Sequence, residues 1–182
     1  SNAMADIEVI SLGYEFLKKL NVIDKITIKI NSLGDDHSRL TYRKVLVDYL
    51  NDYKSQLSTD SIKRLSENPL RILDSKNEID QKILINAPNV LEYLNDESKE
   101  RFHSVCEGLN VLKIRYEIDK NLVRGLDYYC HTAFEFITDE LGSQGTVLAG
   151  GRYDGLSKML GGVEVAGVGW AAGVDRLSLM IQ

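Results

Sequence analysis

Apolar residues recur at two different periods in the first part of the chain, and each period predicts a different kind of element. Spacings of three or four residues predict helices at residues 6–20 and at about residues 38–53. Strict alternation at residues 26–30, with β-branched side chains on the apolar side, predicts a strand between them. Asn21 marks the end of the first helix. The chain therefore begins as helix, strand, helix.

The middle of the chain carries shorter helical patterns with clear start and stop signals. Ser58 offers an N-cap for a helix that ends at Asn68-Pro69. Three further helices are predicted at residues 77–86, 88–94 and 96–109. Acidic residues outnumber basic ones in this segment, and no basic stripe stands out. The simplest interpretation is a small helical unit with a solvated, charged exterior.

Strand patterns return in the last third, and ten of the 14 glycines lie between residues 142 and 173. Alternation predicts strands at residues 112–118, 132–138, 146–149 and 165–170, followed by a helix at 171–181. The connections are too short to hold crossover helices, which favours antiparallel pairing. The predicted class is α+β, a mostly antiparallel sheet with flanking helices and a small all-helical insertion.

Composition narrows the class of protein. The 182 residues are 43% hydrophobic and 27% charged, with a net charge of −5, which is typical of one globular domain with a small insertion. The two cysteines, Cys106 and Cys130, lack ligand-like spacing, which excludes a disulfide scaffold and suits a reducing compartment. Neither a membrane helix nor a signal peptide is predicted. Residues 1–3 read as a protease-cleavage scar, and we leave them out of the fold prediction.

The glycine-rich run at residues 167–173 (GVGWAAG) lies where a strand becomes a helix. Its third glycine comes one residue late for a dinucleotide-binding loop, and no ribose-binding acid follows. The small residues of this run still allow a ligand or a neighbouring strand to approach the backbone closely. Arg176 then adds a permanent cation, unless the run serves only strand–helix packing and Arg176 makes a surface ion pair.

Two clusters of arginine, tyrosine and glycine are better candidates for a binding site. Residues 124–129 (RGLDYY) and 150–155 (GGRYDG) each join a flexible backbone to an arginine suited to phosphate or carboxylate. Either cluster alone could be a turn whose tyrosines fill the core. Both together, at strand ends, favour a substrate cleft.

Metal binding and nucleophilic catalysis have little support. The acidic pair Asp35 and Asp36, with His37, and the separate His131 have no second ligand at a useful offset. No serine, histidine and aspartate are spaced as a triad. We therefore expect no resident metal.

These clusters resemble motifs of the histidyl-tRNA synthetase family. Residues 122–129 (LVRGLDYY) resemble its first histidine-specific motif, and residues 149–156 (AGGRYDGL) resemble the second. Residues 167–177 (GVGWAAGVDRL) are similar to motif 3 of class II aminoacyl-tRNA synthetases. Residues 68–77 (NPLRILDSKN) are similar to bacterial members. The matches follow the family order over essentially all of residues 4–182.

The resemblance implies an enzyme that joins histidine to ATP and passes it to tRNA(His), with magnesium carried by the ATP. Arg124 would contact the α-phosphate and the histidine carboxylate, where a fixed cation stabilises the developing charge. The family roles fall on these positions: catalysis, Arg124; histidine binding, Arg124, Tyr128, Tyr129, Arg152 and Tyr153; ATP binding, Arg124, Gly169, Gly173 and Arg176.

The resemblance also implies a domain division and an incomplete site. Residues 4–53 and 111–182 would form part of the class II catalytic domain, and residues 54–110 the helical insertion near the tRNA acceptor arm. Motifs 1 and 2, the upstream glutamate and glutamine of the histidine pocket, and an anticodon-binding domain have no counterpart. We expect an internal fragment, inactive alone, of a cytoplasmic homodimer.

Two other functions remain open. A non-catalytic, synthetase-like regulatory subunit of histidine biosynthesis would keep the fold without needing residues 54–110 or an intact arginine–tyrosine motif. The presence of Arg124 and Tyr129 argues against it. A binding module unrelated to synthetases would leave the ordered motifs as coincidence.

Overall fold

The apolar periodicity of the chain produces one sheet and two groups of helices in the computed structural model, which describes residues 2–126, 128–142 and 145–181. The strands are β1 (Thr27–Ser32), β2 (Glu117–Ile118), β3 (Cys130–Ile137), β4 (Thr146–Arg152) and β5 (Val168–Ala172). The α-helices are α1 (Ala3–Lys19), α2 (Asp36–Asp52), α3 (Thr59–Glu67), α4 (Glu78–Leu84), α5 (Asp96–Val111), α6 (Leu156–Met159) and α7 (Val174–Ile181). Short 3-10 helices are η1 (Ile23–Lys25), η2 (Pro69–Ile72) and η3 (Val90–Tyr93).

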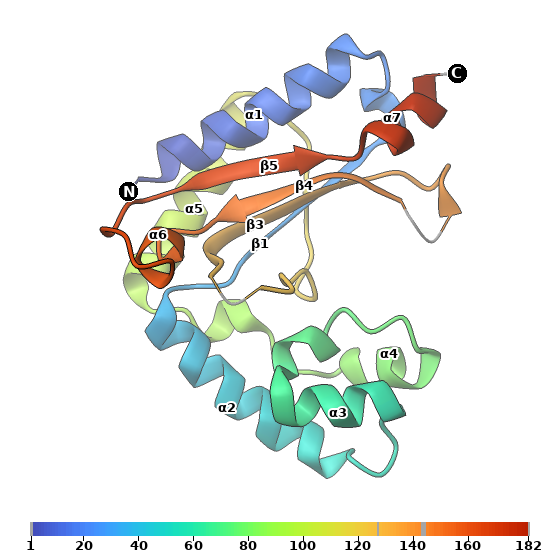
Figure 1. The fold of residues 1–182 in the computed structure, drawn as a ribbon, viewed down its shortest axis with the longest axis vertical. Coiled ribbons are helices and arrows are strands. Elements are labelled where there is room, and N and C mark those ends of the chain that lie inside the picture. Colours follow the sequence, from blue (N-terminus) through green and yellow to red (C-terminus); the bar gives the residue numbers. More distant parts are fainter. Residues whose placement is uncertain (1, 127, 143–144, 182) are drawn as a thin grey trace.

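The sheet has the strand order β2-β1-β3-β4-β5. The short β2 runs parallel to β1, and the other neighbours are antiparallel (Figure 1). This confirms the predicted α+β class with a mostly antiparallel sheet. Of the described residues, no helix combines the length and the apolar character needed to cross a bilayer.

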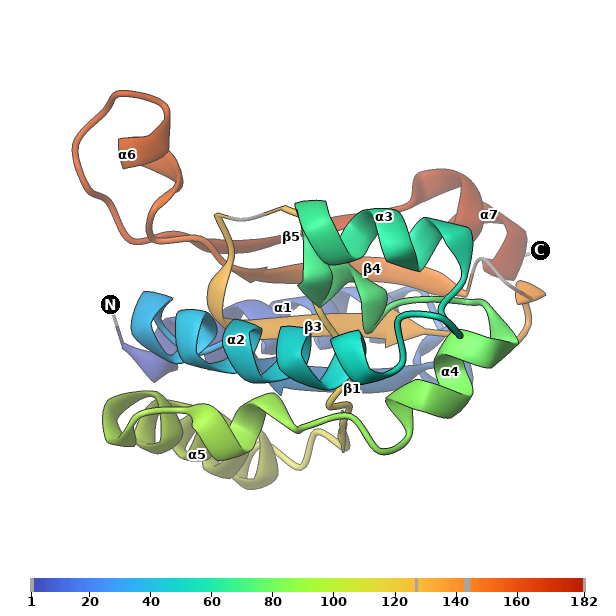
Figure 2. The same cartoon turned by 90° about the horizontal axis from the view of Figure 1, so that it is seen from below.

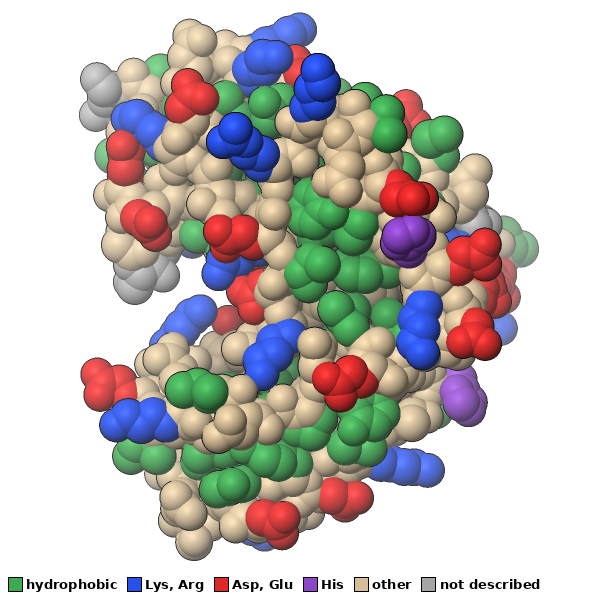
Figure 3. All heavy atoms as spheres, turned by 180° about the vertical axis from the view of Figure 1, so that it is seen from behind, with side chains coloured by type: hydrophobic (Ala, Val, Ile, Leu, Met, Phe, Trp, Pro, Cys, Tyr) green, Lys and Arg blue, Asp and Glu red, His purple; other side chains and the backbone are tan. Residues whose placement is uncertain are grey.

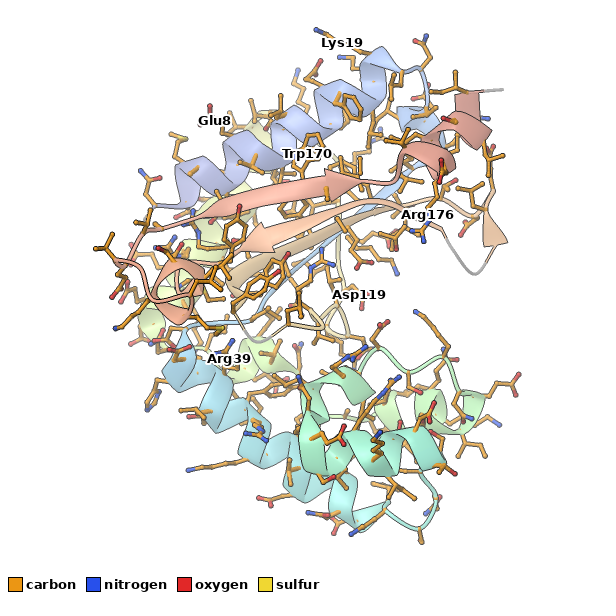
Figure 4. The ribbon with its side chains drawn as sticks, viewed as in Figure 1. Glu8, Lys19, Arg39, Asp119, Trp170 and Arg176 are labelled. Atoms are coloured by element: carbon orange, nitrogen blue, oxygen red, sulfur yellow. The ribbon has the colours of Figure 1, made fainter. Side chains whose placement is uncertain are left out.

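One face of the sheet is covered by α1 and α5. Alternation along β1 and β3 turns Ile30, Phe134 and Phe136 toward these helices, and all three are fully buried. Trp170 of β5 lies against α1 (Figure 4), where its indole N–H donates to the carbonyl of Val9 at 3.1 Å. Its ring stacks on Phe16 with a centroid distance of 5.6 Å. The larger hydrophobic core lies between this face and the two helices.

A second core holds the helical lobe of the molecule, which we define as α2, α3, η2, α4 and η3. Tyr42, Leu46 and Leu50 form the buried stripe of α2 and pack among apolar residues of the other segments. The lobe lies below the sheet in Figure 1 and in front of it in Figure 2, on the side of the sheet away from α1. Leu91 packs against both cores and joins them.

The predicted domain limits at residues 54 and 110 stay a prediction, but the two cores favour different limits. Helix α5 contributes Phe102, Val105 and Leu109 to the larger core beside the sheet. Helix α2 belongs instead to the helical lobe. Packing therefore favours limits near residues 36 and 95.

The predicted strand at residues 112–118 is wrong for most of its length, because α5 extends to Val111 and ends in a left-handed turn. Lys113 has φ 58°, its N–H donates to the carbonyl of Asn110, and the N–H of Ile114 donates to that of Leu109. These are the two hydrogen bonds of a Schellman C-cap. The alternation therefore came from a helix end, and only β2 remains a strand.

Two further boundaries differ. Strand β5 begins at Val168 and takes in two alanines predicted as helical, so α7 begins only at Val174. Within the predicted helix at residues 88–94, only Val90–Tyr93 is helical, and it is the 3-10 helix η3 instead of an α-helix.

Candidate active site

The face of the sheet opposite α1 has a floor of small side chains. Alternation places Ala149 and Gly151 of β4 on this open face, in register with Ala171 and Gly169 of β5. Because these residues carry at most a methyl group, a ligand can lie close to the backbone. The floor adjoins the three sequence clusters predicted to bind substrate.

Arg124 lies on this floor. Its Nη1 donates to Oε1 of Glu135 at 2.9 Å, and its Nη2 donates to the carbonyl of Gly150 at 2.7 Å and to that of Phe134. Its guanidinium carbon is 5.7 Å from the centroid of the Tyr129 ring, within cation–π range. The Arg124 side chain is 12% exposed, so its charge is only partly screened by water.

Three tyrosines gather beside Arg124, as the sequence clusters predict. The ring centroids of Tyr128 and Tyr129 are 4.7 Å apart, and Tyr153 meets both edge-on, at 6.3 Å and 6.0 Å. Burial, with a hydrogen bond to Tyr128, raises the pKa of Tyr129 above its usual value. Tyr129 is therefore a neutral phenol at physiological pH and can donate a hydrogen bond.

The glycines of β5 make room for Tyr153. A Cβ atom on Gly169 would lie 2.8 Å from the Tyr153 hydroxyl oxygen, and one on Gly167 would lie 2.6 Å from the ring. The resemblance implies a nucleotide beside Gly169. The structure shows a second reason for a glycine at position 169, because a side chain there would collide with Tyr153.

Arg176 of α7 lies at the far end of the same floor (Figure 4). Its Nη1 donates to the carbonyl of Thr146 at the start of β4. Gly173 precedes it, and a Cβ atom there would be 3.3 Å from the Arg176 Cδ. Gly173 donates its N–H to the carbonyl of Val147, which ties the start of α7 to β4.

Arg152, which the sequence resemblance also assigns to histidine binding, makes a buried ion pair with α1. Its side chain is 1% exposed and lies on the helix-covered face, where its Nε donates to Oδ1 of Asp6 at 2.9 Å. Its Nη1 donates to Oδ1 of Asp154 at 2.8 Å, and that oxygen also accepts the N–H of Gly167. Arg152 therefore ties α1 to the loop behind Tyr153, and its guanidinium faces away from Arg124.

Two polar residues on the open face had no functional signal in the sequence. Glu135 appears only as an outward position of a strand, and Thr146 as a strand start. In the fold, Oγ1 of Thr146 donates to Oε2 of Glu135 at 3.3 Å, while Oε1 of Glu135 holds Arg124. Glu135 and Thr146 are recognised as candidate site residues only from their neighbours in the folded sheet, and not from the sequence pattern.

A cleft of about 580 Å³ separates the open face of the sheet from the helical lobe. It is lined by Glu135 and Lys29 of the sheet, by Asp119, and by residues of α4. Figure 3 shows the surface hollowed between the two parts. Lys29 pairs with Asp119 at 3.1 Å. The floor with Arg124 is thus continuous with a polar cleft large enough for a small molecule.

A second cleft, of about 620 Å³, lies on the other side of Tyr128 and Tyr129, and His131 and Asp154 contribute to its wall. His131 has φ 47° at a β-bulge between Cys130 and Ala133. Burial, with the nearby Arg101 cation, lowers the pKa of His131 below its usual value. Within residues 2–126, 128–142 and 145–181, no three His, Cys, Asp or Glu side chains are grouped to hold a metal ion.

The fold and site define a class: an α+β domain that presents arginines and tyrosines on the open face of an antiparallel sheet. The profile of the histidyl-tRNA synthetase family matches residues 1–177. The chain belongs to the histidyl-tRNA synthetase family. It is 53% identical over 179 residues to the histidine–tRNA ligase of Rickettsia bellii and 53% identical over 180 residues to that of Rhodospirillum rubrum. These alignments cover 98% and 99% of this chain but 43% of each relative, so the chain spans less than half their length.

Solved structures agree on the fold. The apo histidyl-tRNA synthetase of Staphylococcus aureus superposes with a TM-score of 0.76 at 34% identity, covering 100% of this chain and 44% of that one. A Bacillus halodurans protein described as an ATP phosphoribosyltransferase regulatory subunit/histidyl-tRNA synthetase gives 0.60 at 19% identity, covering 100% of this chain and 51% of that one. The latter likeness concerns the fold alone, and the regulatory-subunit alternative is not favoured.

Proposed function

We propose that the protein containing this chain is a histidine–tRNA ligase. It would join L-histidine to ATP, release pyrophosphate, and pass the histidyl group to tRNA(His), acting as a homodimer. Support comes from the family membership and from the names of relatives 53% identical to the chain. The observation that carries the proposal is Arg124 on the small-residue floor, flanked by Tyr128, Tyr129 and Tyr153.

In the first step, an oxygen of the histidine carboxylate attacks the α-phosphorus of ATP, and the bond to the pyrophosphate oxygen breaks. Negative charge grows on the non-bridging oxygens, and a preoriented guanidinium is suited to stabilise it. We assign this role to Arg124. Its contacts to Glu135 and the carbonyl of Gly150 hold the group in place before substrate binds, which reduces the reorganisation that catalysis would need.

Histidine binding is assigned to the tyrosine cluster, beside Arg124. Tyrosine rings give an apolar wall for an imidazole, and their hydroxyls can hydrogen-bond its nitrogens. An amino acid without those nitrogens would leave buried polar groups unpaired, which is an effective basis for rejection. ATP binding is assigned to Arg124, Arg176 and the backbone beside Gly169 and Gly173, and magnesium would enter with the ATP.

The test is histidine-dependent ATP–pyrophosphate exchange by the full-length protein, followed by charging of tRNA(His). We expect histidine alone among the amino acids to support exchange. Arg124→Ala should lower kcat by about 100-fold or more, whereas Arg115→Ala, an exposed arginine of the same chain, should leave it unchanged. Exchange supported equally by another amino acid, or an unaffected Arg124→Ala variant, would refute the proposal.

A further inference from the structure

The two cations of the floor are joined by a continuous polar path across the sheet. Arg176 donates to the carbonyl of Thr146, and the hydroxyl of that same threonine donates to Oε2 of Glu135 at 3.3 Å. The other carboxylate oxygen, Oε1, accepts from Nη1 of Arg124 at 2.9 Å. Residues 124 and 176 are thus linked through two intermediate residues, Thr146, by its backbone carbonyl and its hydroxyl, and Glu135, by its carboxylate.

The path crosses the middle of the sheet at Glu135, which has a neighbouring strand on each side. Glu135 is in the middle of β3, in register with Lys29 on one side and Ala149 on the other. Its side chain is 21% exposed and that of Arg124 is 12% exposed. A partly buried ion pair is screened less than a surface pair, and both side chains keep few rotamers among fixed neighbours.

We propose that Glu135 and Thr146 are positioning residues, and that their bridge fixes the Arg124 guanidinium relative to Arg176. Glu135 acts on substrate only through Arg124, and Thr146 acts on Arg124 only through Glu135. The inference rests on the proposed function for its kinetic consequences, but the restraint on Arg124 can be measured without any activity. Two cations that must engage one triphosphate gain rate from a fixed separation, because misplacement by about 1 Å can cost about 100-fold.

The kinetic experiment uses Glu135→Gln, Thr146→Val and the double variant in the full-length protein. Glu135→Gln keeps an oxygen acceptor but removes the charge, and Thr146→Val removes the hydroxyl while keeping the backbone carbonyl that Arg176 needs. We expect kcat for exchange to fall about 10-fold or more in Glu135→Gln, with KM for histidine little changed. The double variant should be no worse than Glu135→Gln alone, because Thr146 acts through Glu135. Glu117→Gln, an exposed carboxylate of β2, is the matched control.

The second measurement is hydrogen exchange of the Arg124 Nε–H by NMR in the 182-residue chain. We expect Glu135→Gln and Thr146→Val to speed that hydrogen exchange more than they speed exchange of the backbone amides of β3 and β4, while Glu117→Gln leaves it unchanged. An unchanged Arg124 signal would overturn the positioning role, as would separate kinetic losses that multiply in the double variant. If the wild-type protein shows no ATP–pyrophosphate exchange but the hydrogen exchange of Arg124 responds to the substitutions, the proposed function fails and the positioning role stands.

Discussion

Two buried carboxylates, those of Asp80 and Asp6, each join segments that are separate in the sequence. Asp80 of α4 is fully buried, and its oxygens accept from the backbone N–H and hydroxyl of Ser58 and from the hydroxyls of Ser61 and Ser75, at 2.6–2.9 Å. One side chain thereby ties α3, α4 and the turn between them. Asp6 does the same on the sheet side through Arg152.

Replacing Asp80 should therefore destabilise the helical lobe and change its response to acid. Burial alone would raise the pKa of Asp80, but the hydrogen bonds from the three serines outweigh it, and the pKa lies below its usual value. The stabilisation is complete above the unfolded pKa of about 3.9 and is lost as pH falls through the lower folded pKa. We expect Asp80→Asn to cost about 2–3 kcal/mol at pH 7 and much less at pH 2, measured by urea unfolding.

The matched control for Asp80 is Glu92→Gln, an exposed acid of the same lobe. It should change the free energy of unfolding by less than about 0.5 kcal/mol. Equal losses in the two variants, or an Asp80→Asn loss that does not depend on pH, would contradict a charge-dependent role.

At the scale of elements, α2 and α5 begin at the same place and cap each other. Oδ1 of Asp35 accepts the N–H of Ser38 at 2.8 Å, and Oδ1 of Asn95 accepts that of Ser98 at 2.9 Å. The two caps are bound together, because Nδ2 of Asn95 donates to Oδ2 of Asp35 at 2.8 Å. This junction connects a helix of the lobe to a helix of the sheet core.

Removing the shared cap should cost more than removing an ordinary one. An isolated N-cap is worth about 1 kcal/mol, and Asp35→Ala also leaves the amide of Asn95 without its acceptor. We expect a loss of about 2 kcal/mol for Asp35→Ala in thermal or urea unfolding. Ser58→Thr, which keeps a capping hydroxyl at α3, should cost far less. A loss of 0.5 kcal/mol or less for Asp35→Ala would show that the junction is not cooperative.

The sequence predicted an element correctly where its pattern fits only one kind of structure, and wrongly where the same pattern fits either a helix end or a strand. The alternation at residues 26–30 appears in β1, and the stop at Asn21 is a Schellman cap with φ 58°, in which the N–H of Val22 donates to the carbonyl of Leu17. The end of α5 uses the same cap, but its C′ residue is Lys113, which carries no glycine or asparagine signal. Apolar alternation after an unmarked cap looks like a strand.

On the scale of the whole molecule, the site lies between two cores that are joined at few points. Each core contains a long helix with a fully buried leucine that suits a matched comparison, Leu17 in α1 and Leu50 in α2. These helices have equal lengths of 17 residues. The chain therefore offers a matched pair of cavity mutations, one on each side of the cleft.

Leu50→Ala should destabilise the helical lobe without destabilising the core between the sheet and α1. Each leucine truncation is expected to cost about 3 kcal/mol in its own core. Amide hydrogen exchange should speed up in α2, α3 and α4 for Leu50→Ala, and in α1, β1 and β3 for Leu17→Ala. Uniform acceleration across all elements in both variants would mean that the two cores unfold as one unit.

The sequence nominated the arginines and tyrosines of the candidate site but not the directions in which their side chains point. Arg124 and Arg152 each adjoin a glycine and have a tyrosine within the next four residues, so their sequence surroundings are alike. The strand pleat decides between them, since Arg152 continues β4 toward the helices, whereas Arg124 comes from a loop that crosses the other face. Glu135 could not be recognised at all, because its role depends on neighbours from another strand and a loop.

The ion pair between Asp6 and Arg152 sets the order in which this part of the protein can be completed. The two residues are 146 positions apart in the chain. On a ribosome adding 5–20 residues per second, α1 would wait about 7–30 s for Arg152, with only α5 available to cover part of its apolar stripe. Synthesis of this region therefore passes through a long interval in which an early helix must be kept from the wrong contacts. This interval ends when β4 and β5 are synthesised and can pack against α1.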